Sequence, residues 1–147
     1  MYTIQETKVH VRWMIGRDMS EVLAIEKKSF EKPWYEEDFR QHLRQRNTIG
    51  MVAEDERERN IGYMVYALHK YAIEIIKLAV HPEHRKRQVG KAMIDKLKSK
   101  LSIQRRKRLI VDIDERNLDG QLFLQREGFR ATAVLLNTAE YRMEYSL

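Results

Sequence analysis

The chain has 147 residues, a net charge of +6 and no cysteine, which excludes disulfide bonds, thiolate metal sites and a cysteine nucleophile. Its length is ordinary for one domain, and we expect a single domain over residues 1–147. The N-terminus lacks the pattern of a signal peptide, and no apolar run approaches the roughly 18 residues that a membrane span needs. We therefore expect a soluble, cytoplasmic protein without a membrane partner.

The positive charge is concentrated in one part of the chain. Residues 85–108 contain eleven Lys or Arg and one acid, a local charge of +10, which leaves −4 for the rest of the chain. Such a patch attracts anions, for example a phosphate-bearing cofactor, an acidic protein or RNA, although a helix with a solvated basic face gives the same pattern.

Apolar periodicity predicts a mixed α/β (α+β) fold in the order β-α-α-β-β-β-α-β-α-β-β, with a central sheet of about six to seven strands and about four flanking helices. The expected elements are a strand over 8–15, helices over 16–30 and 32–45, strands over 48–55, 60–70 and 71–80, a helix over 88–102, a strand over 107–114, a helix over 117–129, and strands over 130–137 and 139–147.

Individual residues set several of these boundaries. Pro33 is expected to open the second helix, because proline suits the first turn of a helix. Asn117 is a candidate N-cap of the last helix, and Gly128 is a candidate stop. The third helix should have one buried stripe, since apolar residues recur at steps of four: Val89, Met93, Leu97 and Leu101.

The turn before that third helix combines cations with a glycine, in "VHPEHRKRQVGKAM". A strand, a cationic turn and a helix form an arrangement that binds phosphate, because the first amides of a helix have no partner within it. We expect Gly90 to let a ligand approach the backbone closely. The motifs GxxxxGK and GxGxxG are both absent, which argues against a nucleoside triphosphatase or a Rossmann domain.

Residues 87–92, Arg-Gln-Val-Gly-Lys-Ala, match the R/Q-x-x-G-x-G/A signature of the GNAT acyltransferases. The preceding "LAVHPEHR" is similar to the fourth strand of that family and its exit. Two further segments, "EKKSFEKPWYEEDF" and "DERNLDGQLFLQREGF", resemble the RimI-type group, which acetylates the N-terminal alanine of a small-subunit ribosomal protein. The resemblance covers nearly the whole chain and implies a GNAT fold.

The resemblance also implies acetyl-CoA as cosubstrate. In the family, backbone amides of the signature loop hold the pyrophosphate, and the strand before the loop splays open to pair with the pantetheine arm. Asn117 corresponds to a residue that touches the cofactor in RimI-like members, although a plain N-cap is an equal alternative. The implied cofactor residues here are Leu78, Ala79, Val80, Arg85, Arg87, Gln88, Val89, Gly90, Lys91, Ala92 and Asn117.

Acetyl transfer to an amine requires a base, and the leaving thiolate must be protonated or stabilised. Glu74 occupies the position of the base in histone-type GNAT enzymes, four residues before Leu78 and, by the period of two, on the same strand face. Asp112 occupies the position of the RimI-type Glu. The RimI-type Tyr is replaced by Leu124, which cannot donate a proton.

Simpler roles are open for these residues. Glu74 could pair with a Lys or Arg across the sheet, and Asp112 could pair with its neighbours Lys107 or Arg108. Tyr141 or Tyr71 could supply the proton, yet either is also an ordinary amphipathic residue of a sheet. The short segment "LLNTAEYRM" replaces an aromatic loop of RimI-like proteins, so we expect a tight hairpin and a more open acceptor groove.

The first hypothesis is therefore an acetyl-CoA-dependent N-acetyltransferase that acts on a protein N-terminal α-amine, with a protein or peptide acceptor that could be ribosomal. The alternative is a weak or inactive GNAT domain that binds acetyl-CoA or acts as an interaction module. Specific nucleic-acid binding is not expected, and the spacing of the five histidines argues against a metal site. A monomer and a dimer are both compatible with the sequence.

Overall fold

The computed structural model describes residues 8–85 and 88–147, and its elements follow the predicted order. The strands are β1 (His10–Trp13), β2 (Thr48–Glu54), β3 (Asn60–Leu68), β4 (Ala72–Val80), β5 (Arg108–Asp114), β6 (Arg130–Leu135) and β7 (Glu140–Ser146). The helices are α1 (Met19–Ser29), α2 (Glu36–Leu43), α3 (Val89–Lys98) and α4 (Leu118–Arg126). Short 3-10 turns at Gly16–Asp18 and Pro82–His84 precede α1 and α3.

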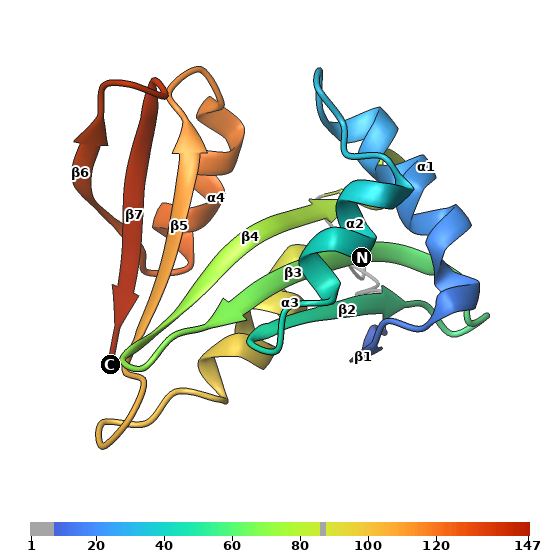
Figure 1. The fold of residues 1–147 in the computed structure, drawn as a ribbon, viewed down its shortest axis with the longest axis horizontal. Helices are drawn as coiled ribbons and strands as arrows, with labels where there is room; N and C mark the ends of the chain where they lie inside the picture. The colour runs from blue at the N-terminus through green and yellow to red at the C-terminus, as the bar shows by residue number, and fades with distance from the viewer. Residues whose placement is uncertain (1–7, 86–87) are drawn as a thin grey trace, which may run out of the picture.

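The strands form one mixed sheet in the order β1-β2-β3-β4-β5-β7-β6. Neighbouring strands are antiparallel except β4 and β5, which run parallel and are connected through α3. β4 and β5 pair only near their starts and then diverge, so the sheet opens into two arms (Figure 1). We call strands β1 to β4 the N-terminal arm and strands β5 to β7 the C-terminal arm.

The N-terminal arm is covered by helices on both faces. α1 and α2 pack on one face, and α3 packs on the other (Figure 1). β3, in the middle of this arm, is buried along eight of its nine residues, which is why its sequence reads as a nearly continuous apolar run. Two apolar cores result, one under α1 and α2 and one under α3.

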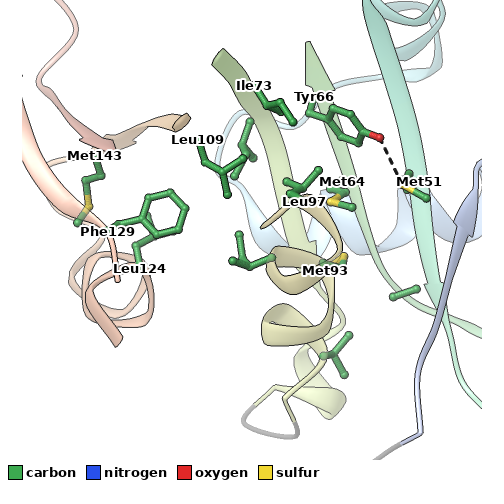
Figure 2. Packing of buried hydrophobic residues seen from close by; sticks show 14 of the residues in the cluster. Met51, Met64, Tyr66, Ile73, Met93, Leu97, Leu109, Leu124, Phe129 and Met143 are labelled. Carbon is green, nitrogen blue, oxygen red and sulfur yellow. Dashed lines mark hydrogen bonds between the residues drawn. The ribbon is translucent and has the colours of Figure 1, made fainter. Parts of the chain in front are cut away.

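The core under α3 extends across to α4. Of the predicted stripe, Val89, Met93 and Leu97 are buried on α3 and pack with the apolar side chains of the sheet. Leu101 lies beyond the end of the helix and is only partly buried against the same core. Figure 2 shows Leu124 and Phe129, at the C-terminal arm, in the same layer of side chains as Met93 and Leu97. One continuous core therefore joins the two arms on this face.

Two predicted helix boundaries are wrong. α2 begins at Glu36 and not at Pro33, because the backbone N–H groups of Trp34 and Tyr35 donate to the carboxylates of Glu26 and Asp38 and hold the preceding segment extended. α3 ends at Lys98 and not near residue 102, where the chain continues in turns. Gly128 follows α4 with a φ of 95°, a left-handed conformation that favours glycine, as its predicted role as a stop requires.

Candidate active site

The divergence of β4 from β5 leaves one edge of β4 open. Pairing in the described sheet runs from Ala72 with Arg108 to Ile75 with Val111 and then stops. From residue 76 to residue 80, β4 is held by β3 on its other edge only. The predicted cofactor residues of this strand, Leu78, Ala79 and Val80, lie in this segment. Its free edge can therefore offer backbone hydrogen bonds to an extended ligand.

The first turn of α3 is uncapped. Gln88, the N-cap residue, has a left-handed φ of 65° and makes no side-chain cap hydrogen bond, and the first turn contains no acid. The N–H groups of Val89, Gly90 and Lys91 have no acceptor within the helix, because the first intrahelical bond runs from the Ala92 N–H to the Gln88 carbonyl. An anion at this end also gains from the helix dipole. Arg87, another predicted cofactor residue, lies outside the described residues.

Gly90 has a packing role that the sequence did not indicate. A Cβ atom at this position would lie 3.0 Å from Cζ of Phe123 on α4. The glycine therefore lets α3 approach α4 closely, which is a different reason for its presence from the expected approach of a ligand.

Two described cations near this turn, Arg85 and Lys91, are engaged within the protein. Arg85 donates from Nε to the Val80 carbonyl at 3.2 Å and from Nη2 to the Ser29 hydroxyl at 3.3 Å. Lys91 lies near Glu127 and Asp95, whose charges raise the pKa of its ammonium. Among the described residues of this turn, the backbone amides are therefore better placed to bind an anion than these two side chains.

Asn117 acts as the N-cap of α4. Its Oδ1 atom accepts a hydrogen bond of 2.9 Å from the Gly120 N–H. Of the two roles that the sequence left open, the N-cap is present in the structure, and contact with the cofactor stays a prediction.

The prediction that Glu74 and Leu78 share a strand face is wrong. Tyr66 and Val65 of β3 pair with Ile75 and Lys77 of β4, so Ile76 is an extra residue in the ladder, a β-bulge. The alternation of side chains between the two faces of the sheet therefore shifts by one residue after Ile75. Leu78 packs in the core under α3, whereas Glu74 lies on the opposite face of the sheet.

Glu74 is half-exposed, and its partner is a histidine rather than the expected Lys or Arg. Its Oε1 atom lies 2.8 Å from Nε2 of His69, and its side chain retains 40% of its accessible surface. Glu74 lies one residue before Ile75, the last residue of β4 that pairs with β5, and the two arms begin to separate there. A carboxylate at this point can reach a ligand that enters between the arms.

Asp112 lies on the same sheet face as Glu74 but is held by a bidentate ion pair. Arg142 of β7 donates from Nε and Nη2 to the two carboxylate oxygens at 2.9 and 3.0 Å. The expected partners, Lys107 and Arg108, are wrong, since residues 112 and 142 are direct partners across β5 and β7. Asp112 raises the pKa of Arg142, and Glu74 adds to this effect, so the three charges share one neighbourhood.

Tyr141 does not join this group. It alternates along β7 with Arg142 and therefore points to the other face, where it lines a groove of about 460 Å³ between α4 and β6. Tyr71 lies at the turn before β4 and is exposed, and Leu124 is buried in the core under α3 and α4. No hydroxyl among these predicted candidates lies on the face that carries Glu74 and Asp112.

A buried charged cluster on the face of β4 that packs against α1 escaped the sequence analysis. Glu26 of α1 is fully buried and accepts hydrogen bonds from the hydroxyl of Tyr63, from Nζ of Lys77 at 2.9 Å and from the Trp34 N–H at 2.8 Å. Burial raises the pKa of Tyr63 far above its ordinary value, so this hydroxyl remains a donor. Nζ of Lys77 also lies 3.9 Å from the ring centroid of Phe30.

The spacing of α1 could have revealed Glu26. Val22 and Ile25 are fully buried, and residue 26 follows Val22 by four and so lies on the same helix face. For Arg142, the alternation of polar and aromatic residues in "EYRMEYS" places it beside Glu140 and Glu144, but no local pattern indicates Asp112 as its partner.

A model of the acetyltransferase (GNAT) family matches residues 19–129, most of the chain. The chain belongs to this family. The comparison with curated protein sequences gave no match.

Solved structures share the GNAT fold over nearly the full chain. The ribosomal-protein-S18-alanine N-acetyltransferase from Escherichia coli is 14% identical, with a TM-score of 0.79 over 95% of this chain and 94% of that one. NAA60 from Arabidopsis thaliana, in complex with acetyl-CoA, is 17% identical, with a TM-score of 0.80 over 95% and 100%. A chimera of spermidine N-acetyltransferase SpeG from Vibrio cholerae is 17% identical, with a TM-score of 0.78 over 94% and 95%.

GNAT enzymes use acetyl-CoA, and two features of this chain fit that cosubstrate. The open edge of β4 suits the amide-bearing pantetheine arm, and the uncapped amides at Val89, Gly90 and Lys91 suit the pyrophosphate. Within residues 8–85 and 88–147, no group of three His, Asp or Glu side chains could hold a metal ion. None of the described helices is long and apolar enough to cross a membrane.

Proposed function

We propose that this GNAT enzyme transfers the acetyl group of acetyl-CoA to the N-terminal α-amine of a protein, and that Glu74 accepts the proton that the amine loses. The observation that carries the proposal is the position of Glu74, half-exposed on β4 where the two arms separate. Acetyl-CoA supplies the acetyl group as a thioester, and the chain supplies the base and the binding surface.

Glu74 is preferred to Asp112 because of their hydrogen bonds. Both oxygens of Asp112 accept hydrogen bonds from Arg142, so the ion pair occupies the sides of the carboxylate that would face an incoming amine. Only Oε1 of Glu74 takes part in a hydrogen bond found in the described part of the chain. The Asp112–Arg142 pair would instead position Arg142 and hold positive charge near Glu74.

An α-amine suits such a base better than a lysine does. Free α-amines have a pKa of about 8, whereas lysine side chains have one of about 10.4. A solvent-accessible carboxylate is a weak base, so it serves best an amine that is already partly neutral near pH 8. The likeness to the ribosomal-protein-S18-alanine N-acetyltransferase from Escherichia coli fits a protein acceptor.

The test measures the coenzyme A thiol that is released when acetyl-CoA is incubated with each of three acceptors. These are an Ala-initiated peptide, the same peptide with a blocked N-terminus and one internal lysine, and spermidine. We expect turnover on the free N-terminus, reduced kcat for Glu74→Gln across the pH range, and a smaller reduction for Asp112→Asn. Turnover on spermidine alone, or no effect of Glu74→Gln, would contradict the proposal.

A second function is favoured by one observation. Leu124, at the position of the RimI-type Tyr, is buried in the core, so that position supplies no acid. If acetyl-CoA raises the melting temperature but no acceptor releases thiol, the chain is an acetyl-CoA-binding module. The ribosomal acceptor and the cytoplasmic location expected from the sequence stay predictions.

A further inference from the structure

The end of the molecule where β4 and β5 begin carries exposed cations that acetyl transfer does not use. They come from the turn between β3 and β4, the end of α3 and the loop that leads to β5. We call this group the basic tip, and its members are Lys70, Lys96, Lys100, Arg105 and Lys107.

Hydrogen bonds hold these segments together. Arg106 of the loop donates from Nε to the His69 carbonyl at 2.6 Å, which ties the loop to the turn between β3 and β4. The Leu147 N–H donates to the Lys107 carbonyl at 3.0 Å, which ties the C-terminus to the same loop. The turn, the loop and the C-terminus gather at the lower left of Figure 1.

The charge of the basic tip is not compensated. Residues 99–108 contain five Lys or Arg and no acid. The nearest acids are engaged elsewhere: Glu74 pairs with His69, Glu144 with Arg108, and Asp95 with Lys91. Of the ion pairs found in residues 8–85 and 88–147, none includes a member of the basic tip. A surface of this kind attracts a polyanion.

An exposed aromatic ring lies among these cations. Tyr71, in the turn, keeps 61% of its accessible surface, and Nζ of Lys70 lies 5.2 Å from its ring centroid. In the sequence, Tyr71 stands far from the basic stretch that contains Arg105 and Lys107. The fold therefore places an aromatic ring beside a basic patch that has none of its own.

We propose that the basic tip binds the phosphate backbone of single-stranded nucleic acid without sequence preference, with a base stacked on Tyr71. Phosphate contacts are made chiefly by Lys and Arg, and aromatic stacking is tolerant of sequence. An acidic protein is a poorer fit, because lysine is depleted in protein–protein interfaces. Four of the five cations of the basic tip are lysines: Lys70, Lys96, Lys100 and Lys107.

The basic tip is separate from the proposed cosubstrate site. The amides that would hold the pyrophosphate lie at the first turn of α3, and Lys96 and Lys100 lie at its other end. A helix of this length, ten residues, spans about 15 Å. Nucleic acid on the basic tip therefore leaves the first turn of α3 accessible.

The test is fluorescence anisotropy of a labelled oligouridylate of about 20 nucleotides between 50 and 200 mM salt. The variant Lys70→Gln/Arg105→Gln/Lys107→Gln should weaken binding at least tenfold at the lower salt. It should also reduce the slope of log affinity against log salt by about 2, since each lost phosphate contact contributes about 0.7 for a single strand. Tyr71→Ala should weaken binding about five- to tenfold and leave the slope unchanged.

The matched control is Lys27→Gln/Lys28→Gln/Arg57→Gln, which removes the same charge from exposed positions on α1 and in the turn between β2 and β3. Equal weakening by both triple variants would overturn the proposal, because net charge alone would then explain binding. Equal binding of polyglutamate would assign the surface to an acidic protein and overturn it as well. Both triple variants should retain the increase in melting temperature with acetyl-CoA, and its loss in the basic-tip variant would refute the separation of the two sites.

Discussion

The two arms of the sheet differ in how their charges are held. In the N-terminal arm, helices cover both faces, and its central charged pair, Glu26 with Lys77, is buried with further hydrogen bonds. In the C-terminal arm, α4 covers one face only, and the charges of Asp112 and Arg142 face solvent. The charged pair of the N-terminal arm is therefore shielded from water, whereas that of the C-terminal arm is accessible to solvent.

Removal of one charge from each arm should give the largest difference in stability. Glu26→Ala leaves the ammonium of Lys77 buried without its carboxylate, at a cost of about 3–5 kcal/mol in the free energy of unfolding. Asp112→Ala breaks a partly exposed pair and should cost no more than about 1 kcal/mol. Urea unfolding measures both. Similar losses in the two variants would show that the arms do not differ as described.

Truncation of apolar side chains extends the comparison to packing. Met64→Ala in β3 removes a fully buried side chain and should cost about 2–5 kcal/mol. Val134→Ala in β6, at the exposed edge of the sheet, should change the free energy of unfolding by less than about 0.5 kcal/mol. Amide hydrogen exchange should show the same order, with β3 protected more strongly than β6. Faster amide exchange in β3 than in β6 would refute the stronger packing of the N-terminal arm.

Acidification should weaken the N-terminal arm through Asp18. This buried carboxylate accepts two hydrogen bonds of 2.8 Å from Arg12, which hold its pKa well below the ordinary value. Since the folded-state pKa is depressed, its stabilisation is present above about pH 4 and is lost as the pH falls further. Asp18→Asn should be less stable than the wild type at pH 7, with a difference that shrinks towards pH 3. Unfolding in urea across this range measures it, and a constant difference would contradict the assignment.

The junction of the arms should show a smaller effect. Gly90→Ala forces Phe123 to move and should cost about 1 kcal/mol in the wild type. In a Phe123→Ala background the same change should be neutral or stabilising by up to about 1 kcal/mol, because alanine favours the helix. A double-mutant cycle of the two substitutions measures the packing effect on the free energy of unfolding. The increase in melting temperature with acetyl-CoA, measured for each variant, reports ligand binding separately. If Gly90→Ala abolishes the increase in melting temperature with acetyl-CoA in both backgrounds, the glycine is needed for binding of acetyl-CoA.

Local patterns in the sequence predicted the order of elements well. The period of four in α3 reflects which side chains face the core, and it was confirmed for Val89, Met93 and Leu97; the strand expected over 139–147 was also confirmed. The glycine-containing turn before α3 stays a predicted anion site; its position at the start of a helix, which a local pattern can indicate, was confirmed. Helix ends were less well predicted, since the bonds of Glu26 and Asp38 to residues 34 and 35 involve side chains of α1 and α2.

Long-range contacts decide where the candidate catalytic residues Glu74 and Asp112 lie and which side chains they contact. Alternation counted from Leu78 placed Glu74 on the wrong face, because a bulge at Ile76 is set by pairing with β3 and leaves no mark in the sequence of β4. The partners of Asp112 and Glu74 were also mispredicted, since Arg142 comes from another strand and His69 from the preceding turn.

Sequence patterns alone predicted the element order, most of the buried stripe of α3, the turn that we expect to bind an anion, and the resemblance to the family. Periodicity and backbone geometry act over a few residues and can be read locally. Only the tertiary structure decided which charges meet, that Glu26 and Lys77 are buried together, and that Tyr71 stands beside the basic tip. Such pairings depend on how segments that are distant in the sequence meet in space. One extra residue in a strand is enough to move the following side chains to the opposite face of the sheet.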